Sequence, residues 1–172
     1  MTAPPLPPVR SALVTTDLSE FGNRAVSWAY AVVAPGGVVH LMHVIEPVHV
    51  PNPLYAHYTP GKAPTADERA IQRRAIEEQL RALVPVGAKE KAVETLVAVS
   101  EDDEVARSIC EAAAARDVDL VCMSSHGRSG LSKVLLGSVA ERVLEHCKRP
   151  LFVVPPSARV AGLAEGDRPE RS

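Results

Sequence analysis

Two kinds of apolar pattern alternate along the chain, and each predicts a different element. Unbroken apolar runs rich in β-branched residues are typical of strands that a sheet buries on both faces. Such runs occur at Val9–Thr16, Val38–Ile45, Ala92–Val99, Val118–Met123 and Leu151–Val154. Pro150 and Pro155 bound the last run on its two sides. The runs therefore predict five strands in this order along the chain.

Between the strands, apolar residues recur at helical spacing. The first such segment begins at Glu20 and ends before Pro35-Gly36-Gly37, which stops a helix. Its apolar face comprises Phe21, Ala25, Trp28, Ala29 and Val32. Apolar residues at this spacing form one stripe along a helix, which packs against a core. We therefore expect this helix to cover one face of the sheet.

Capping patterns predict the starts of two further helices. Thr65 is followed three residues later by Glu68, which forms a capping box and predicts a helix that continues to about Leu83. Ser100 and Asp103 have the same spacing and predict a second start. The inward positions of that second helix would be Val105, Ile109 and Ala112.

Strands that alternate with helices predict the α/β class, because parallel strands need helical crossovers. With a last helix over Leu131–Cys147, we expect a five-stranded parallel sheet in a flavodoxin-like or Rossmann-like three-layer sandwich. Right-handed crossovers favour strand order 3-2-1-4-5. We expect a Pro-rich N-terminal arm over residues 1–8, one α/β domain over 9–156 and a flexible tail over 157–172. Residues 46–63, rich in proline, predict a long loop.

Composition and charge exclude several classes of function. The chain has 19 Lys and Arg against 21 Asp and Glu, a net charge of −2, whereas a protein that binds nucleic-acid backbones needs a basic excess. No apolar run approaches the length of a membrane span, and the start lacks a signal-peptide pattern. Three cysteines without a CxxC spacing form neither a disulfide framework nor a zinc pattern. We expect a reduced, cytoplasmic protein with no nucleic-acid and no membrane partner.

The predicted strand order directs attention to two loops. The winding reverses between the first and fourth strands, and ligands bind at the carboxyl ends of such strands. The loop after the first strand contains Thr15-Thr16-Asp17-Leu18-Ser19. Asp17 could accept hydrogen bonds from a hydroxyl or amine of a ligand, or it could cap the next helix. Ser19 is also placed to cap, and both interpretations of Asp17 stay open.

The loop after the fourth strand is Ser124-Ser125-His126-Gly127-Arg128-Ser129-Gly130, and Gly137-Ser138 follow in the next helix. Glycines near a helix start allow backbone N–H groups to approach an anion closely. The loop predicts a phosphate cradle with Arg128 as its counter-charge, although a plain strand–helix connection is the competing interpretation. The P-loop pattern and the dinucleotide fingerprint G-x-G-x-x-G are both absent, so NAD binding is not expected.

Three separated segments resemble the universal stress protein family, and the resemblance extends over about Val9–Val154. The segments are Ala12–Glu20 (ALVTTDLSE), His40–Glu46 (HLMHVIE) and Ser124–Glu141. The nucleotide-binding branch of that family carries the motif G-x2-G-x9-G-[ST]. Here the nine residues from 128 to 136 separate Gly127 from Gly137-Ser138, so the last two parts match. Ser124 stands in place of the first glycine.

The resemblance implies a regulatory protein of the stress response that binds ATP or AMP between the first and fourth strands, with Mg²⁺ held through the phosphates. It implies contacts from Thr15, Thr16, Asp17, Val44, Ser124, Ser125, His126, Gly127, Arg128, Ser129, Gly130, Gly137, Ser138 and Val139. Asp17 would hold the ribose or base, and Val44 would contact adenine through its backbone. A slow ATPase or self-phosphorylating enzyme, and a nucleotide-free structural stress protein, are the alternatives.

The last strand predicts a homodimer. Leu151–Val154 is apolar throughout and lies at the expected edge of the sheet, where an uncovered strand invites pairing. The family resemblance also implies pairing of this strand across a two-fold axis, so that it meets its own copy. The competing interpretation is that the tail over 157–172 folds back and covers the edge.

Histidines and a serine suggest other chemistry that the pattern does not support. His40, His43, His49 and His57 lie close together in sequence. However, His40 and His43 point to opposite faces of a strand, so they do not share a metal ion. We expect no metal site. His126 has no visible partner as a general base, and no nucleophile elbow surrounds Ser138, so no catalytic residue is assigned.

Overall fold

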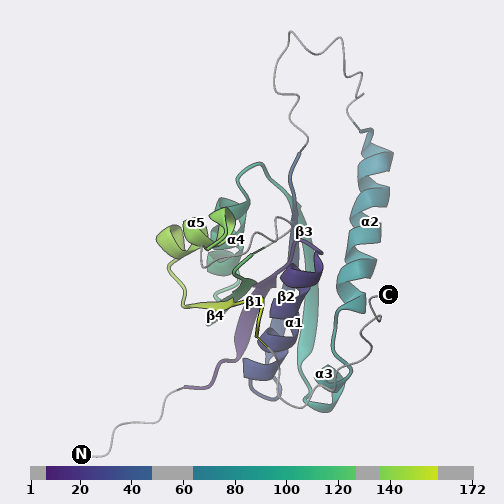
Figure 1. Ribbon diagram of the computed structural model, residues 1–172. Helices are drawn as coiled ribbons and strands as arrows, with labels where there is room; N and C mark the ends of the chain where they lie inside the picture. Colours follow the sequence, from purple (N-terminus) through teal and green to yellow (C-terminus); the bar gives the residue numbers. More distant parts are fainter. Residues whose placement is uncertain (1–6, 48–63, 127–135, 159–172) are drawn as a thin grey trace, which may run out of the picture.

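The computed structural model describes residues 7–47, 64–126 and 136–158, and its centre is one parallel sheet (Figure 1). The strands are β1 (Ser11–Thr15), β2 (Val38–Ile45), β3 (Glu94–Glu101), β4 (Leu120–Ser124) and β5 (Leu151–Val154). They lie in the order β3-β2-β1-β4-β5, and every paired neighbour is parallel. The predicted α/β class and strand order are confirmed.

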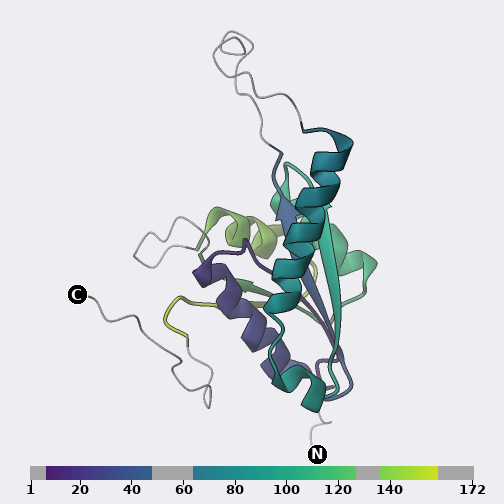
Figure 2. The ribbon, with the colours of Figure 1, turned by 90° about the vertical axis from the view of Figure 1, so that its right-hand side faces the viewer.

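Helices cover both faces of the sheet and complete the three layers. They are α1 (Glu20–Val32), α2 (Ala66–Ala82), α3 (Gly87–Glu90), α4 (Val105–Ala115) and α5 (Ser138–His146). Helices α1 and α2 lie on one face, where Figure 2 shows them in front of the sheet, and α4 and α5 lie on the other.

Strand β1 divides its side chains between these two layers because successive residues of a strand point to opposite faces. Val14 joins the core beneath α1 and α2, where Leu80 of α2 is also fully buried. Leu13 joins the core beneath α4 and α5, together with Ile109 and Val143. Since both faces of β1 are covered, its apolar run has no polar alternation.

Two predicted helix starts agree with the structure. Thr65 accepts a hydrogen bond from the backbone N–H of Glu68, whose carboxylate accepts one from the N–H of Thr65, so the capping box is confirmed. Ser19 caps α1 by accepting a hydrogen bond from the N–H of Gly22 at 3.0 Å. Each cap satisfies a backbone donor that the first turn of a helix leaves without an internal partner.

The predicted capping box at Ser100 and Asp103 is wrong. Ser100 belongs to β3, and its hydroxyl lies 2.9 Å from the hydroxyl of Ser108 in α4. Helix α4 begins after Glu104, which makes no side-chain cap hydrogen bond. Strand β3 continues to Glu101, two residues beyond the predicted end, because its pairing with β2 extends to the last residue of β2. Pairing with β2 therefore places in strand β3 residues that the local pattern assigned to the start of a helix.

The predicted start of the last helix is also wrong. Helix α5 begins at Ser138, and Gly137 before it has extended torsion angles of φ −63° and ψ 150°. The backbone N–H of Gly137 donates to the carbonyl of Ser125 at 2.8 Å, which fixes this extended residue beside the end of β4. Residues 131–135, which were included in the predicted helix, lie outside the described residues. The short helix α3 was not predicted.

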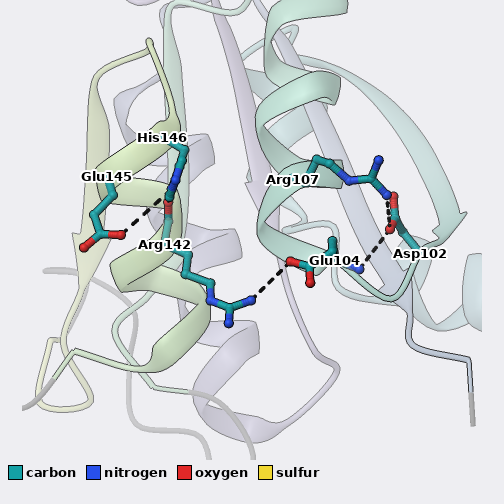
Figure 3. Close-up of polar contacts among 6 residues, drawn as sticks. All are labelled: Asp102, Glu104, Arg107, Arg142, Glu145 and His146. Atoms are coloured by element: carbon teal, nitrogen blue, oxygen red, sulfur yellow. Dashed lines mark hydrogen bonds and ion pairs between the residues drawn. The ribbon is translucent and has the colours of Figure 1, made fainter. Parts of the chain in front are cut away.

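Helix α5 is attached to α4 mainly by apolar contacts. Ala140 and Val143 are buried in the core that α4 shares. On the surface, a guanidinium nitrogen of Arg142 lies 3.2 Å from a carboxylate oxygen of Glu104, a bridge visible in Figure 3. Both of its side chains are more than half exposed, so the pair adds little stability. The buried contacts therefore set the position of α5, and with it the position of its first turn.

Candidate functional site

A cavity of about 620 Å³ opens at the carboxyl ends of β1, β2 and β4. Its size is within the range of small-molecule sites. Ten of the predicted contact residues line it, which are Thr15, Thr16, Asp17, Val44, Ser124, Ser125, His126, Gly137, Ser138 and Val139. The other four, Gly127, Arg128, Ser129 and Gly130, lie outside the described residues. The structure thus brings together every predicted residue that it describes.

Asp17 lies in the turn between β1 and α1. Its Oδ1 accepts a hydrogen bond from the backbone N–H of Ser19 at 3.0 Å and another from the Ser19 hydroxyl at 2.6 Å. Ser19, and not Asp17, caps the helix. The carboxylate therefore stabilises the turn and at the same time forms part of the cavity wall.

The same turn contains a left-handed residue. Leu18 has φ 64°, a conformation that residues with a branched side chain seldom adopt. Its backbone N–H donates to the hydroxyl oxygen of Thr16 at 2.9 Å, and that hydroxyl donates to the side-chain oxygen of Asn23 at 2.7 Å. These bonds connect the end of β1 to the first turns of α1. They hold the unusual conformation that directs Asp17 to the cavity.

Gly22 is a residue of the cavity wall that sequence reasoning missed. A Cβ atom at this position would lie 2.1 Å from Oδ1 of Asp17 and 3.1 Å from the hydroxyl oxygen of Thr16. The absence of a side chain therefore leaves room for the Asp17 carboxylate against α1. A glycine inside the first turn of a helix, where it costs stability, was the available signal in the sequence.

The turn after β4 is built from three polar residues. The N–H of Ser125 donates to the carbonyl of Val154 in β5 at 2.9 Å, and the Ser125 hydroxyl lies 2.9 Å from Nδ1 of His126. The Ser124 hydroxyl donates to the carbonyl of His126 and accepts from its N–H. A Cβ at Gly137 would lie 3.1 Å from the Ser125 carbonyl oxygen, so the two segments approach closely there.

The first turn of α5 forms part of the cavity wall. Ser138, Val139 and Ala140 line the wall, and the N-cap residue Gly137 has no side chain with which to satisfy their N–H groups. Backbone donors at a helix start, together with the positive end of the helix dipole, favour an anion. This part of the cavity wall is thus suited to phosphate, and the Asp17 carboxylate forms another part of the same wall.

His43 also lines the cavity. From the sequence, this residue was considered only as a metal ligand. It lies on β2, its side chain is buried, and its Nδ1 is 2.8 Å from the carbonyl oxygen of Thr16. No group of three potential metal ligands lies together in the described part of the chain. His49 and His57 lie outside it.

The α2 side of the wall was not predicted either. Gln72 and Ile76 of α2 line the cavity, and so do Ile45 and Glu46 at the end of β2. On the opposite side, Val105 and Ile109 of α4 contribute apolar surface. Positions on crossover helices contribute to a site through packing, so a search limited to the loops after β1 and β4 does not find them.

None of the helices in the described ranges has the length and apolar character needed to cross a membrane.

Comparison with known proteins gives relatives of similar fold. A segment of 49 residues is 45% identical to the universal stress protein MJ0531 of Methanocaldococcus jannaschii and spans 28% of this chain. That segment is 29% of the relative, so the match spans less than a third of the relative's length. The solved structure of MJ0577 from the same organism is 23% identical, has a TM-score of 0.62, and is matched over 86% of this chain and 96% of its own.

A second solved structure adds a ligand to the comparison. It is a universal stress protein in complex with cAMP, 21% identical to this chain, with a TM-score of 0.55. The match covers 88% of this chain and 100% of that one. At these identities the likeness is one of fold.

The family of this chain is shown by a match that extends over most of its sequence. The model of the universal stress protein family matches residues 8–155, which include all five strands and all five helices of the described structure. The three segments that carried the resemblance lie within that span. The chain belongs to the universal stress protein family.

Proposed function

We propose that this protein binds an adenine nucleotide, ATP or AMP, in the cavity at the carboxyl ends of β1 and β4, and acts as a regulatory protein of the stress response. The observation that carries the proposal is that one cavity wall combines groups suited to phosphate with a group suited to a nucleoside. The first turn of α5 offers backbone donors to phosphates, and Asp17 offers an acceptor to the hydroxyls of ribose or the amine of adenine.

The comparisons support the same ligand class. The chain belongs to a family of which one member of the same fold was solved with cAMP, an adenine nucleotide. In the proposed orientation, adenine lies near Val44 at the end of β2, and the phosphates lie near Gly137, Ser138 and Val139. Mg²⁺, when bound, would neutralise phosphate oxygens. The loop residues Gly127–Gly130 are proposed to enclose the phosphates.

Calorimetric titration with AMP, ATP and cAMP tests the proposal. Asp17→Ala should weaken AMP binding by about 1.5–3 kcal/mol, the range for a hydrogen bond to a charged group, which is roughly 10- to 150-fold in Kd. Asp119→Ala is the matched control. Its carboxylate accepts from the N–H groups of Arg10 and Ser11 at the opposite end of the sheet, so its loss should leave affinity unchanged.

The same samples separate the alternatives. A wild-type protein that binds none of the three nucleotides would contradict the proposal and favour a nucleotide-free structural role. Release of ADP from bound ATP over hours, absent from a heat-denatured control, would identify a slow ATPase. Incorporation of phosphate into the protein would identify self-phosphorylation. Binding without either reaction is the expected result.

We also propose a homodimer through β5. This strand ends the sheet, and beyond β4 it has no other strand neighbour among the described residues. Leu151, Phe152 and Val153 are only half-buried, although Trp28 of α1 contacts the Phe152 ring edge-on at 5.9 Å between centroids. Pairing with a second copy would cover these apolar groups and satisfy the backbone of the edge.

Sedimentation at tens of micromolar protein tests the dimer. The wild type should sediment as a dimer, and Val153→Lys should give monomers because two like charges would approach across the axis. A wild-type monomer, or an unchanged dimer of the variant, would contradict this proposal.

A further inference from the structure

His43 is a buried polar side chain for which the proposed function has no use so far. It lies on β2, is 6% exposed, and forms part of the cavity wall. Its Nδ1 is 2.8 Å from the carbonyl oxygen of Thr16. A carbonyl only accepts hydrogen bonds, so Nδ1 carries the proton and donates it. The ring therefore has a defined tautomer and a defined partner.

The partner, Thr16, is the first residue beyond β1. Its backbone N–H donates to the carbonyl of Met42 at 3.1 Å, so β2 binds Thr16 through both of its backbone groups. The first of these bonds continues the ladder, whereas the second depends on the imidazole. The His43 side chain thus fixes the peptide unit that leads directly into Asp17.

The conformation beyond that peptide is one that the chain does not adopt easily. Leu18 is left-handed, and the turn is held by the hydroxyl of Thr16 and by the contacts between Asp17 and Ser19. An unfavourable backbone conformation persists only where its surroundings determine it. If the Thr16 peptide were free to rotate, the Thr16 hydroxyl would lose its alignment with the N–H of Leu18. The carboxylate of Asp17 would then lose its fixed place in the wall.

We propose that His43 is a positioning residue of the nucleotide site, which holds the Thr16 carbonyl so that Asp17 keeps its place in the cavity wall. The inference rests on the proposed function, because it gives Asp17 a ligand. His43 itself needs no contact with the nucleotide. Its effect on affinity is exerted through the turn between β1 and α1.

Two substitutions separate this role from general packing. Asparagine places an amide N–H close to the position of Nδ1, so His43→Asn keeps a donor for the Thr16 carbonyl. His43→Leu has a similar size but no donor. The Leu variant should bind AMP up to about tenfold more weakly than wild type, the equivalent of one lost hydrogen bond, and the Asn variant should recover most of this loss. His43→Gln, which carries its amide one bond further out, replaces the Leu variant if that variant does not fold.

A double-mutant cycle tests the route of the effect. In the Asp17→Ala background, His43→Leu should lower AMP affinity by less than about threefold, because residues that act through one contact are not additive. The Leu variant should also weaken AMP and ATP equally, since the additional phosphates lie on the α5 side of the cavity. Faster amide exchange at residues 17–19 in the ligand-free Leu variant, restored in the Asn variant, is expected independently of any nucleotide.

The results that would overturn the inference differ from those that would overturn the proposed function. A wild-type protein that binds no adenine nucleotide refutes the proposed function, and the role of His43 falls with it. Wild-type binding together with wild-type affinity of the folded Leu or Gln variant refutes only the role of His43. Equal loss in the Leu and Asn variants, or full additivity with Asp17→Ala, refutes it as well.

Discussion

Gly22→Ala is predicted to weaken nucleotide binding even though alanine is the better helix former. Gly22 lies in the first turn of α1, where alanine in place of glycine would by propensity stabilise the helix by about 0.8–1 kcal/mol. The added Cβ would lie 2.1 Å from Oδ1 of Asp17, far inside contact distance. Because the carboxylate is the movable partner, it should rotate away from its position.

The magnitudes follow from what the rotation breaks. Asp17 accepts two hydrogen bonds from Ser19, and a hydrogen bond to a charged group contributes about 1.5–3 kcal/mol. After subtraction of the gain in helix propensity, the loss of one of these two bonds should lower the free energy of unfolding by about 0.5–2 kcal/mol. Affinity for AMP should fall by about 1.5–3 kcal/mol, since the displaced carboxylate no longer meets the ligand.

Gly87→Ala provides the matched control. Gly87 is the first residue of α3, and a Cβ there would meet no atom within 4 Å. This variant should keep wild-type affinity and equal or slightly greater stability. Calorimetric titration with AMP and urea unfolding of the three proteins provide the measurements. If Gly22→Ala retained wild-type affinity, the carboxylate position seen in the structure would not matter for binding, and the reasoning would be refuted.

Three further predictions follow from the packing. Gly137→Val should weaken the binding of ATP far more than the binding of adenosine. Its side chain would press on the Ser125 carbonyl, which lies 3.1 Å from the Cβ position, at the phosphate end of the site. Equal losses of affinity for the two ligands in titration would contradict this. Burial raises the pKa of the Cys122 thiol in the folded protein to about 12. As pH rises, this thiol therefore ionises in the unfolded chain before it ionises in the folded protein. The free energy of unfolding should consequently fall as pH rises above about 8.5. Urea unfolding between neutral and alkaline pH should give a shallower decline for Cys122→Ala. Leu80→Ala, at a fully buried site, should cost about 2–5 kcal/mol, whereas Ile71→Ala, at a residue that is 67% exposed, should change thermal stability little.

Local pattern was enough to predict the five strands, four of the five helices of the described structure, and their order. A buried parallel strand needs an unbroken apolar run, and such a run is a property of neighbouring residues, so the limits of β2 and β5 were predicted without error. The handedness of crossovers then predicted the strand order, and the strand order predicted where the site opens. The capping box at Thr65 was predicted for the same reason, since its two partners are three residues apart.

Tertiary contacts decided what local pattern could not. The Ser100 hydroxyl interacts with Ser108 of α4 instead of capping a helix, because strand pairing extends β3 beyond it. The start of α5 depends on the bond between Gly137 and the carbonyl of Ser125, which joins two segments of the cavity wall.

The parts of the site that sequence reasoning missed have the same origin. The bond from His43 to Thr16 spans 27 residues, and the close approach of Gly22 to Asp17 exists only because of how the turn before α1 is folded. The sequence by itself therefore determined the strands, most of the helices and the end of the sheet where a ligand would bind. Packing determined which side chains stabilise the loops at that end of the sheet. These contacts join residues that are far apart in sequence or that meet only in the folded turn, so local periodicity does not predict them.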